Sequence, residues 1–327
     1  MAGAEQDSFE ARLRAQIDAY HESALVYAAV KLGLPDRLAA GPVTASQLAA
    51  GLGLSAPQLH RFLRGLCTIG ICDERPGGTF ALTVGGQCLT SVSPSGLAAK
   101  VQIVVGQYWR PWAHLISTLE TGRPAFDRAF GMSVSEWRSV NAAQGALFDS
   151  YLAKETAGQL ASIIAAIDLS GVGTVAILPA RYRPDGVPVD RSYIVDMSQP
   201  YLPLLKAVKR VEFVAGDVLD EIPIEADLYL LNGVLRQWDD EQARAILANV
   251  RSAMPGAAKL LIVERLMPER ASDDPAAIML DLHMMAITGG RARSLAEFEA
   301  LLSSAGLAVT KATPTRSGSW VIEAIST

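Results

Sequence analysis

The chain has 327 residues, half of them hydrophobic, and a formal net charge of −5. This length and apolar content predict a large core divided over two domains, while the negative charge argues against a general phosphate-binding surface. No apolar run approaches the roughly 20 residues that span a bilayer, and residues 1–7 lack the basic and apolar segments of a signal peptide. We therefore expect a soluble cytoplasmic protein that binds neither nucleic acid nor membranes.

Residues 1–96 have the pattern of a winged helix-turn-helix domain. Thr44 and Ser55 are good N-caps for helices that reach Leu52 and cover 56–69. A strand at Phe80–Val84 follows a Pro-Gly-Gly turn and supplies the wing. Cys67, Cys72 and Cys88 lie in apolar surroundings without metal-ligand spacing, which favours buried reduced thiols over a metal or redox site.

Two uses of this domain are compatible with the pattern. The second helix carries His60, Arg61 and Arg64, which could face DNA. The same helix carries four large apolar side chains, Leu59, Phe62, Leu63 and Leu66, which favour packing against a partner subunit. The mixed polar and apolar segment from Glu5 to Lys31 suits a helix that contacts a second copy, so we predict a dimerisation domain.

A linker at 91–96 leads into helices over 97–170, which we take as the wall of a substrate cavity. From residue 171 to 327, strands alternate with helices, which predicts an α/β domain with a doubly wound parallel sheet. The predicted strands are Val175–Leu178, Ser192–Asp196, Arg210–Ala215, Leu228–Asn232 and Lys259–Glu264, followed by an antiparallel terminal pair, Ala308–Pro314 and Ser319–Ala324.

The first αβ unit of this domain is shortened. An acid at the end of a second strand, here Asp196, is the ribose-binding position of a nucleotide-binding unit. Such a unit needs a glycine-rich turn and a crossover helix after its first strand. Residues 179–190 instead contain three prolines, no G-x-G and no helical period.

Several strings in the C-terminal half occur in one order that is typical of a known family. They are V-E-F-V-A-G-D at 211–217, V-L-R-Q-W-D-D-E at 234–241, L-I-V-E at 261–264, L-D-L-H-M-M at 280–285 and G-G-R-A-R at 289–293. Together with the winged domain, they make the chain resemble the S-adenosylmethionine-dependent small-molecule O-methyltransferases, both plant caffeate-type and bacterial antibiotic-tailoring. The resemblance implies a Rossmann-like methyltransferase domain and a homodimer formed through the winged domain. It also identifies Asp196 and Asp217 as remnants of contacts to the cofactor's ribose and adenine.

The chain departs from this family at three functional positions. The family's D-x-G-G-G-x-G turn is replaced by L-P-A-R at 178–181. Arg236 stands in place of the histidine base, and arginine stays protonated at neutral pH. Of the two carboxylates that support this base, one is Ala292 here and the other is retained as Glu264. Because an unpaired buried arginine is costly, we expect Glu264 to contact Arg236.

The resemblance also places a substrate cavity against the carboxyl edge of the sheet. Its predicted apolar lining is Trp109, Tyr151, Trp238, Met284 and Met285. Its predicted catalytic group is Arg236, Glu264 and His283, and His283 stands where the family more often has asparagine. A structural ion pair and a hydrogen-bonded core histidine are the alternative interpretations of these polar residues.

Three functions follow from these departures. The favoured one is a natural-product tailoring enzyme that no longer methylates and uses no cofactor. It would catalyse a cyclisation or pericyclic, lyase or isomerase step on an aromatic or polyketide-like metabolite, with Arg236 stabilising negative charge. The second is an O-methyltransferase that uses S-adenosylmethionine through an atypical loop. The third is a non-catalytic partner that forms a heterodimer or binds a metabolite.

Overall fold

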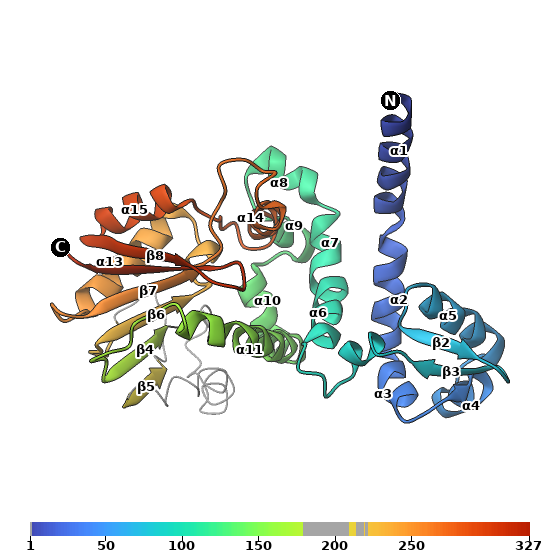
Figure 1. Ribbon diagram of the computed structural model, residues 1–327. Coiled ribbons are helices and arrows are strands. Elements are labelled where there is room, and N and C mark those ends of the chain that lie inside the picture. Colours follow the sequence, from blue (N-terminus) through green and yellow to red (C-terminus); the bar gives the residue numbers. More distant parts are fainter. Residues whose placement is uncertain (1, 179–208, 214–218, 220–221) are drawn as a thin grey trace. The chain divides into compact units, whose positions relative to one another are not determined.

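A computed structural model describes residues 2–178, 209–213, 219 and 222–327, and side chains for these except 2–7 and 210–213. The chain forms two compact units, Met1–Trp109 and Arg110–Thr327 (Figure 1). The predicted boundaries at residues 96 and 170 remain an interpretation of the sequence. Among the described helices, none is long and apolar enough to cross a membrane.

Unit 1 is a winged helical domain with a small antiparallel sheet. Its helices are α1 (Ala2–Asp18), α2 (Tyr20–Lys31), α3 (Leu34–Ala39), α4 (Ala45–Leu52), α5 (Ala56–Thr68), η1 (Gly86–Leu89), α6 (Leu97–Ile103) and a π-helical turn, η2 (Val104–Tyr108). Its strands are β1 (Val43–Thr44), β2 (Cys72–Arg75) and β3 (Thr79–Leu82), in the order β1-β3-β2.

The predicted helix starts in unit 1 are present. Thr44 forms a capping box with Gln47 at α4, and Ser55 is the N-cap of α5. The large apolar side chains of α5 pack into the core of the unit, with Leu59, Leu63 and Leu66 buried. Cys72 is buried and its Sγ lies 3.5 Å from that of half-buried Cys67. Cys88 is exposed, so the prediction of a buried thiol is wrong there.

Unit 2 contains a mixed six-stranded sheet in the order β5-β4-β6-β7-β9-β8. The strands are β4 (Thr174–Leu178), β5 (Arg210–Phe213), β6 (Leu228–Asn232), β7 (Lys259–Glu264), β8 (Leu307–Pro314) and β9 (Trp320–Ser326). β4 to β7 are parallel, and β8 and β9 form the predicted antiparallel terminal pair.

The described strands depart from the classical order at one pairing. β5 pairs directly with β4, from Thr174 opposite Arg210 to Ile177 opposite Phe213. In the classical doubly wound order a second strand lies between the first and the third. The predicted strand Ser192–Asp196 is outside the described residues.

Helices cover both faces of this sheet (Figure 1). The helical elements of unit 2 are α8 (Leu115–Thr121), α9 (Ala125–Phe130), α10 (Val134–Val140), α11 (Ala142–Ile164), η4 (Leu235–Gln237), α13 (Asp240–Ala253), α14 (Pro275–Ile287) and α15 (Leu295–Ser304). A short helix, α7 (Trp109–Trp112), spans the boundary between the units.

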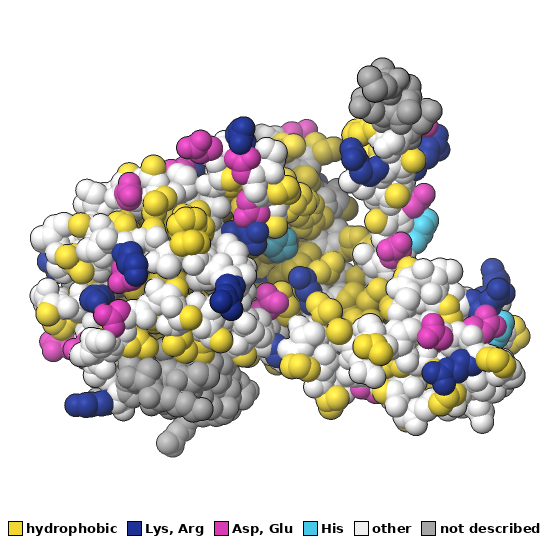
Figure 2. Space-filling view, viewed as in Figure 1, with side chains coloured by type: hydrophobic (Ala, Val, Ile, Leu, Met, Phe, Trp, Pro, Cys, Tyr) yellow, Lys and Arg dark blue, Asp and Glu magenta, His cyan; other side chains and the backbone are white. Residues whose placement is uncertain are grey.

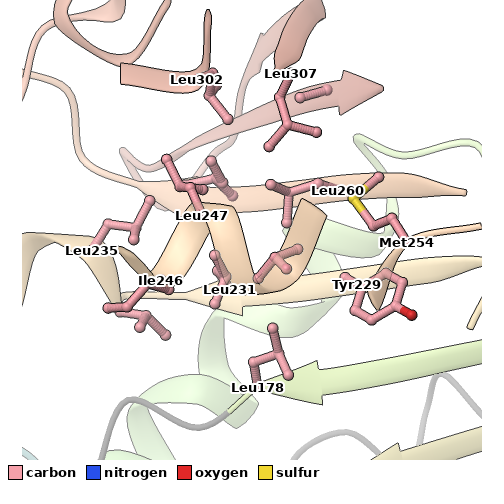
Figure 3. Close-up of a cluster of buried hydrophobic side chains, with 14 of the residues drawn as sticks. Leu178, Tyr229, Leu231, Leu235, Ile246, Leu247, Met254, Leu260, Leu302 and Leu307 are labelled. Atoms are coloured by element: carbon pink, nitrogen blue, oxygen red, sulfur yellow. The ribbon is translucent and has the colours of Figure 1, made fainter. Parts of the chain in front are cut away.

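Alternate strand residues supply the two halves of the core. Leu178, Leu231 and Leu260 point to one face and pack with Ile246 and Leu247 of α13 and with residues of α15 (Figure 3). The alternate residues of these strands, such as Ile177 and Leu230, point to the other face and pack against α11. Because parallel strands buried on both faces are apolar throughout, these strands read as continuous hydrophobic runs in the sequence.

Candidate active site

The candidate site begins at the carboxyl end of β6. Gly233 follows this strand with a φ of +66°, a conformation that favours glycine. η4 comes next and carries Arg236, whose guanidinium lies directly over Gly233. A Cβ at position 233 would come within 2.6 Å of Arg236 Nη2, so this close approach also requires glycine.

Arg236 is held by a buried carboxylate at the end of the next strand. Glu264, the last residue of β7, is 1% exposed, and its Oε2 accepts from Arg236 Nη1 at 2.9 Å. Its Oε1 accepts from the Arg236 backbone N–H at 3.2 Å. The Arg236 side chain is 28% exposed. The expected contact between these two residues is therefore present, and it fixes both the backbone and the cation.

A second arginine holds the backbone on both sides of Arg236. Arg293 is 1% exposed and donates to the carbonyl oxygens of Leu235 at 2.9 Å and Trp238 at 3.0 Å. Its Nε donates to the Asp240 carboxylate at 2.9 Å. Burial raises the pKa of Asp240, but the hydrogen bond and charge of Arg293, with nearby Arg291 and Arg244, lower it overall.

Sequence reasoning missed the role of Arg293. Arg293 is the last residue of the G-G-R-A-R string, of which only position 292, where the family has an acid, was considered in the sequence. Ala292 is buried, and its backbone N–H donates to Asp281 Oδ1 at 2.8 Å. The string therefore stabilises the local fold through hydrogen bonds, although it lacks the family's carboxylate.

His283 lies on α14, which contacts η4. Its Nδ1 accepts a hydrogen bond from Trp112 Nε1 at 3.3 Å, and the two rings are nearly parallel. Burial, together with the charges of Arg138 and Arg236, lowers the pKa of His283 from 6.5 to about 4. The imidazole is thus neutral at pH 7, with its proton on Nε2. The sequence did not predict this contact of Trp112, since a partner 171 residues away leaves no local pattern.

The other predicted site residues are distributed as follows. Met284 is buried and Met285 half-buried beside His283 on α14, and Tyr151 is half-buried on α11. Trp238 follows η4 and packs against the main core of unit 2. Trp109 is the last residue of unit 1, whereas these residues belong to unit 2. Asp196 and Asp217 are outside the described residues.

The cofactor implied by the resemblance would bind at the carboxyl ends of β4 and β6. Strand order reverses at β4, because β5 lies on one side of it and β6 on the other, and ligands bind at such a switch point. The indole N–H of Trp238, just after η4, is buried and has no hydrogen-bond partner among the described residues. An unpaired buried donor near this edge fits a bound molecule with acceptor atoms.

The chemistry available here is that of a fixed cation in largely apolar surroundings. Arg236 cannot accept a proton, and His283 Nδ1 is occupied by Trp112. In the described part of the chain, no three His, Cys, Asp or Glu side chains gather to hold a metal. Figure 2 shows a histidine side chain beside basic and hydrophobic side chains on the viewed face.

Comparison with known proteins identifies relatives along the whole chain. Residues 15–91 match an O-methyltransferase dimerisation domain and residues 185–308 match an O-methyltransferase domain. The phenazine O-methyltransferase PhzM of Lysobacter antibioticus is 31% identical, with 94% of each chain covered. The crystal structure of LaPhzM has a TM-score of 0.87 at 30% identity and covers 98% of this chain and 99% of its own.

A third relative has been solved with its ligands. NcsB1, an O-methyltransferase from neocarzinostatin biosynthesis, has a TM-score of 0.72 at 26% identity, over 94% of this chain and 96% of its own. One of its structures is a complex with S-adenosyl-L-homocysteine and 1,4-dihydroxy-2-naphthoic acid. Another contains S-adenosylmethionine and 2-hydroxy-5-methyl naphthoic acid.

These comparisons overturn two expectations from the sequence. The favoured function, a tailoring enzyme that has lost methyl transfer, is wrong, because the relatives that match nearly the whole chain are methyltransferases. The expectation that no cofactor is used is also wrong, since solved relatives bind S-adenosylmethionine or its product. The replaced turn is only one part of such a cofactor site, which also uses the ends of several parallel strands.

The predicted fold class is confirmed by the same comparisons and by the six-stranded sheet. The matched dimerisation domain precedes the matched methyltransferase domain along the chain. The chain therefore belongs to the family of O-methyltransferases that combine a dimerisation domain with a methyltransferase domain.

Proposed function

We propose that this protein transfers a methyl group from S-adenosylmethionine to an oxygen atom of a small aromatic natural product. The observation that carries the proposal is the relationship to O-methyltransferases over 94% of the chain, in both domains. Bound S-adenosylmethionine supplies the methyl group as an electrophile on a sulfonium. The protein's own residues bind and orient the acceptor and exclude water.

Roles for the site residues follow within this proposal. Tyr151, Trp238, Met284 and Met285, with Trp109, contact the flat acceptor. Asp196 binds the ribose of the cofactor and Asp217 lies near its adenine. Arg236, fixed by Glu264, takes the place of a proton-accepting histidine. Since arginine cannot remove a proton, the acceptor hydroxyl loses its proton to water or reacts as an anion.

The first test is binding of the cofactor by the purified full-length protein. We expect S-adenosylmethionine and S-adenosylhomocysteine to bind with dissociation constants between about 1 μM and 1 mM, measured by calorimetry. Asp196→Ala should weaken binding roughly 10- to 100-fold, since it removes hydrogen bonds to a charged acceptor. Asp273→Ala, at an exposed ion pair on the surface, is the control.

The second arm of this test follows the reaction itself. Protein, S-adenosylmethionine and hydroxynaphthoic acids are incubated together, and mass spectrometry detects a methylated product. A folded protein that binds neither cofactor form contradicts the proposal. So does a protein that binds both forms but methylates no member of a broad panel of phenols and aromatic acids.

The assembly that we propose is a homodimer formed through unit 1. Four apolar side chains of α1 and α2 are exposed and spaced three or four residues apart: Phe9 at 55%, Leu13 at 43%, Ile17 at 65% and Tyr20 at 53%. Such a stripe marks an interaction surface. The match to a dimerisation domain over residues 15–91 supports a second copy as its partner.

Charges placed on this stripe should separate the dimer. We expect Leu13→Glu combined with Ile17→Glu to yield monomers at micromolar concentration in light scattering, because buried unpaired carboxylates oppose association. Ala15→Glu introduces one charge on another face of the same exposed helix and should leave the dimer intact. A wild-type monomer, or an unchanged dimer in the double variant, would contradict this assembly.

A further inference from the structure

The guanidinium of Arg236 is anchored on one side and open on another. Of its nitrogens, only Nη1 has a hydrogen-bond acceptor among the described residues, the Glu264 carboxylate. Gly233 covers one part of the planar group. The Nε and Nη2 donors are left without a protein partner there, and 28% of the side chain is exposed. An arginine held in this way presents a pre-organised pair of N–H donors to a ligand.

The groups around the Arg236 guanidinium favour an anionic ligand over a neutral one. Glu264 has both oxygens occupied by Arg236, so it does not compete for a ligand's donors. His283 is neutral at pH 7, so it adds no charge that would compete with Arg236. Arg138, which is buried and stacked 3.4 Å from the centre of the Phe148 ring, also acts on His283 through its charge.

The same surroundings favour a flat ligand. The Trp112 and His283 rings are inclined by only 19° with their centroids 6.2 Å apart. A planar aromatic ligand beside these rings could place its acidic substituent against the Arg236 guanidinium.

We propose that the open edge of Arg236 binds a carboxylate of the substrate, so that the natural acceptors of this protein are planar aromatic acids. Arginine matches a carboxylate with two parallel N–H···O bonds, a geometry that neither a hydroxyl nor a carbonyl oxygen reproduces. The identification of the bound acid as a methyl acceptor rests on the proposed function. Recognition of the acid by Arg236 does not depend on it.

The test compares a matched pair of probes, 1-hydroxy-2-naphthoic acid and its neutral carboxamide, titrated calorimetrically into the full-length protein at pH 7. Each titration is done with and without saturating S-adenosylhomocysteine. The wild-type protein should bind the acid roughly 10- to 100-fold more tightly than the amide, as expected for a charge-assisted pair. 1-Naphthol, which lacks the carboxyl group, should bind as weakly as the amide.

The variants are chosen so that the charge of the ion pair is removed without stranding a buried carboxylate. Arg236→Gln alone would leave Glu264 unpaired at 1% exposure. Combining Arg236→Gln with Glu264→Gln keeps the shape and a hydrogen bond, and should reduce the preference for the acid to less than threefold. Arg236→Lys should retain part of the preference. Arg270→Gln, at an exposed ion pair elsewhere in unit 2, should retain all of it.

The proposal would be overturned by equal affinity of the wild type for acid and amide, by an undiminished preference in the folded double variant, or by binding of 1-naphthol as tight as that of the acid. Failure of the wild type to bind the acid at all would also overturn it. A preference for the acid without methyl transfer would refute the proposed function and leave this inference standing. Methyl transfer without a preference for the acid would support the proposed function and refute this inference.

Discussion

Replacing Arg293 with methionine should lower the free energy of unfolding by about 3 kcal/mol. The exchange keeps most of the apolar stem but removes the Arg293 donors from the carbonyls of Leu235 and Trp238, although the Leu235 carbonyl still accepts from the Trp238 backbone N–H at 3.3 Å. A backbone acceptor left buried without a donor, as at Trp238, costs about 1–3 kcal/mol. The Asp240 carboxylate, which is 43% exposed, can return to water, so it adds little. Urea denaturation followed by circular dichroism measures the difference.

Arg291 provides a matched control two residues away. It also pairs with Asp240, and with Glu297, but its side chain is 45% exposed. Arg291→Met should therefore cost less than about 1 kcal/mol, as exposed ion pairs do. Equal losses in the two variants would mean that charge near Asp240, and not the buried backbone contacts, determines the stability of this region.

Acid should destabilise the protein through His283 over a defined pH range. The ordinary histidine pKa of 6.5 applies in the unfolded chain, whereas burial, Arg138 and Arg236 lower the folded pKa to about 4. Between these values the unfolded chain binds the proton and the folded protein does not, so stability falls as pH falls from 6.5 to 4. The difference between the two pKa values corresponds to about 3 kcal/mol over the whole range.

His283→Asn removes this titration and keeps an acceptor for the Trp112 N–H. Unfolding free energies measured from pH 7.5 to 4 should fall less steeply in the variant than in the wild type, with the gap growing as the pH drops. The stability of each protein at pH 7.5 serves as its own reference. Parallel curves over this range would show that His283 has the same pKa in the folded and unfolded states.

Much of the fold could be predicted because its signals are local. Leu228–Asn232 and Lys259–Glu264 are continuous apolar runs bounded by polar residues, and both are strands with the predicted limits. The winged arrangement was readable from N-caps and a Pro-Gly-Gly turn. The region from 97 to 121 was predicted only as helical, while the structure breaks it into α6, a π-helical turn, α7 and α8.

The site divides in the same way between local and long-range signals. The contact between Arg236 and Glu264 could be expected, because a buried charge needs a partner. Two contacts join residues that are distant in the sequence and leave no periodic pattern. They are the hydrogen bond between Trp112 and His283 and the hydrogen bonds from Arg293 to two backbone carbonyls. Cofactor use could not be predicted from the three prolines in 179–190, because other strand ends also contribute to a cofactor site.

Gly290 limits how this site can be redesigned. A Cβ there would collide with the backbone of Arg236 and Gln237, so the segment after α14 and the turn at η4 touch main chain to main chain. Gly233 is restricted for another reason, its φ of +66°, which holds whatever side chain stands at position 236. An engineer seeking new acceptors can vary the side chain at position 236 but cannot shift the backbone that carries it. Libraries that randomise the apolar wall on α14 should therefore be more productive than those that randomise the two glycines.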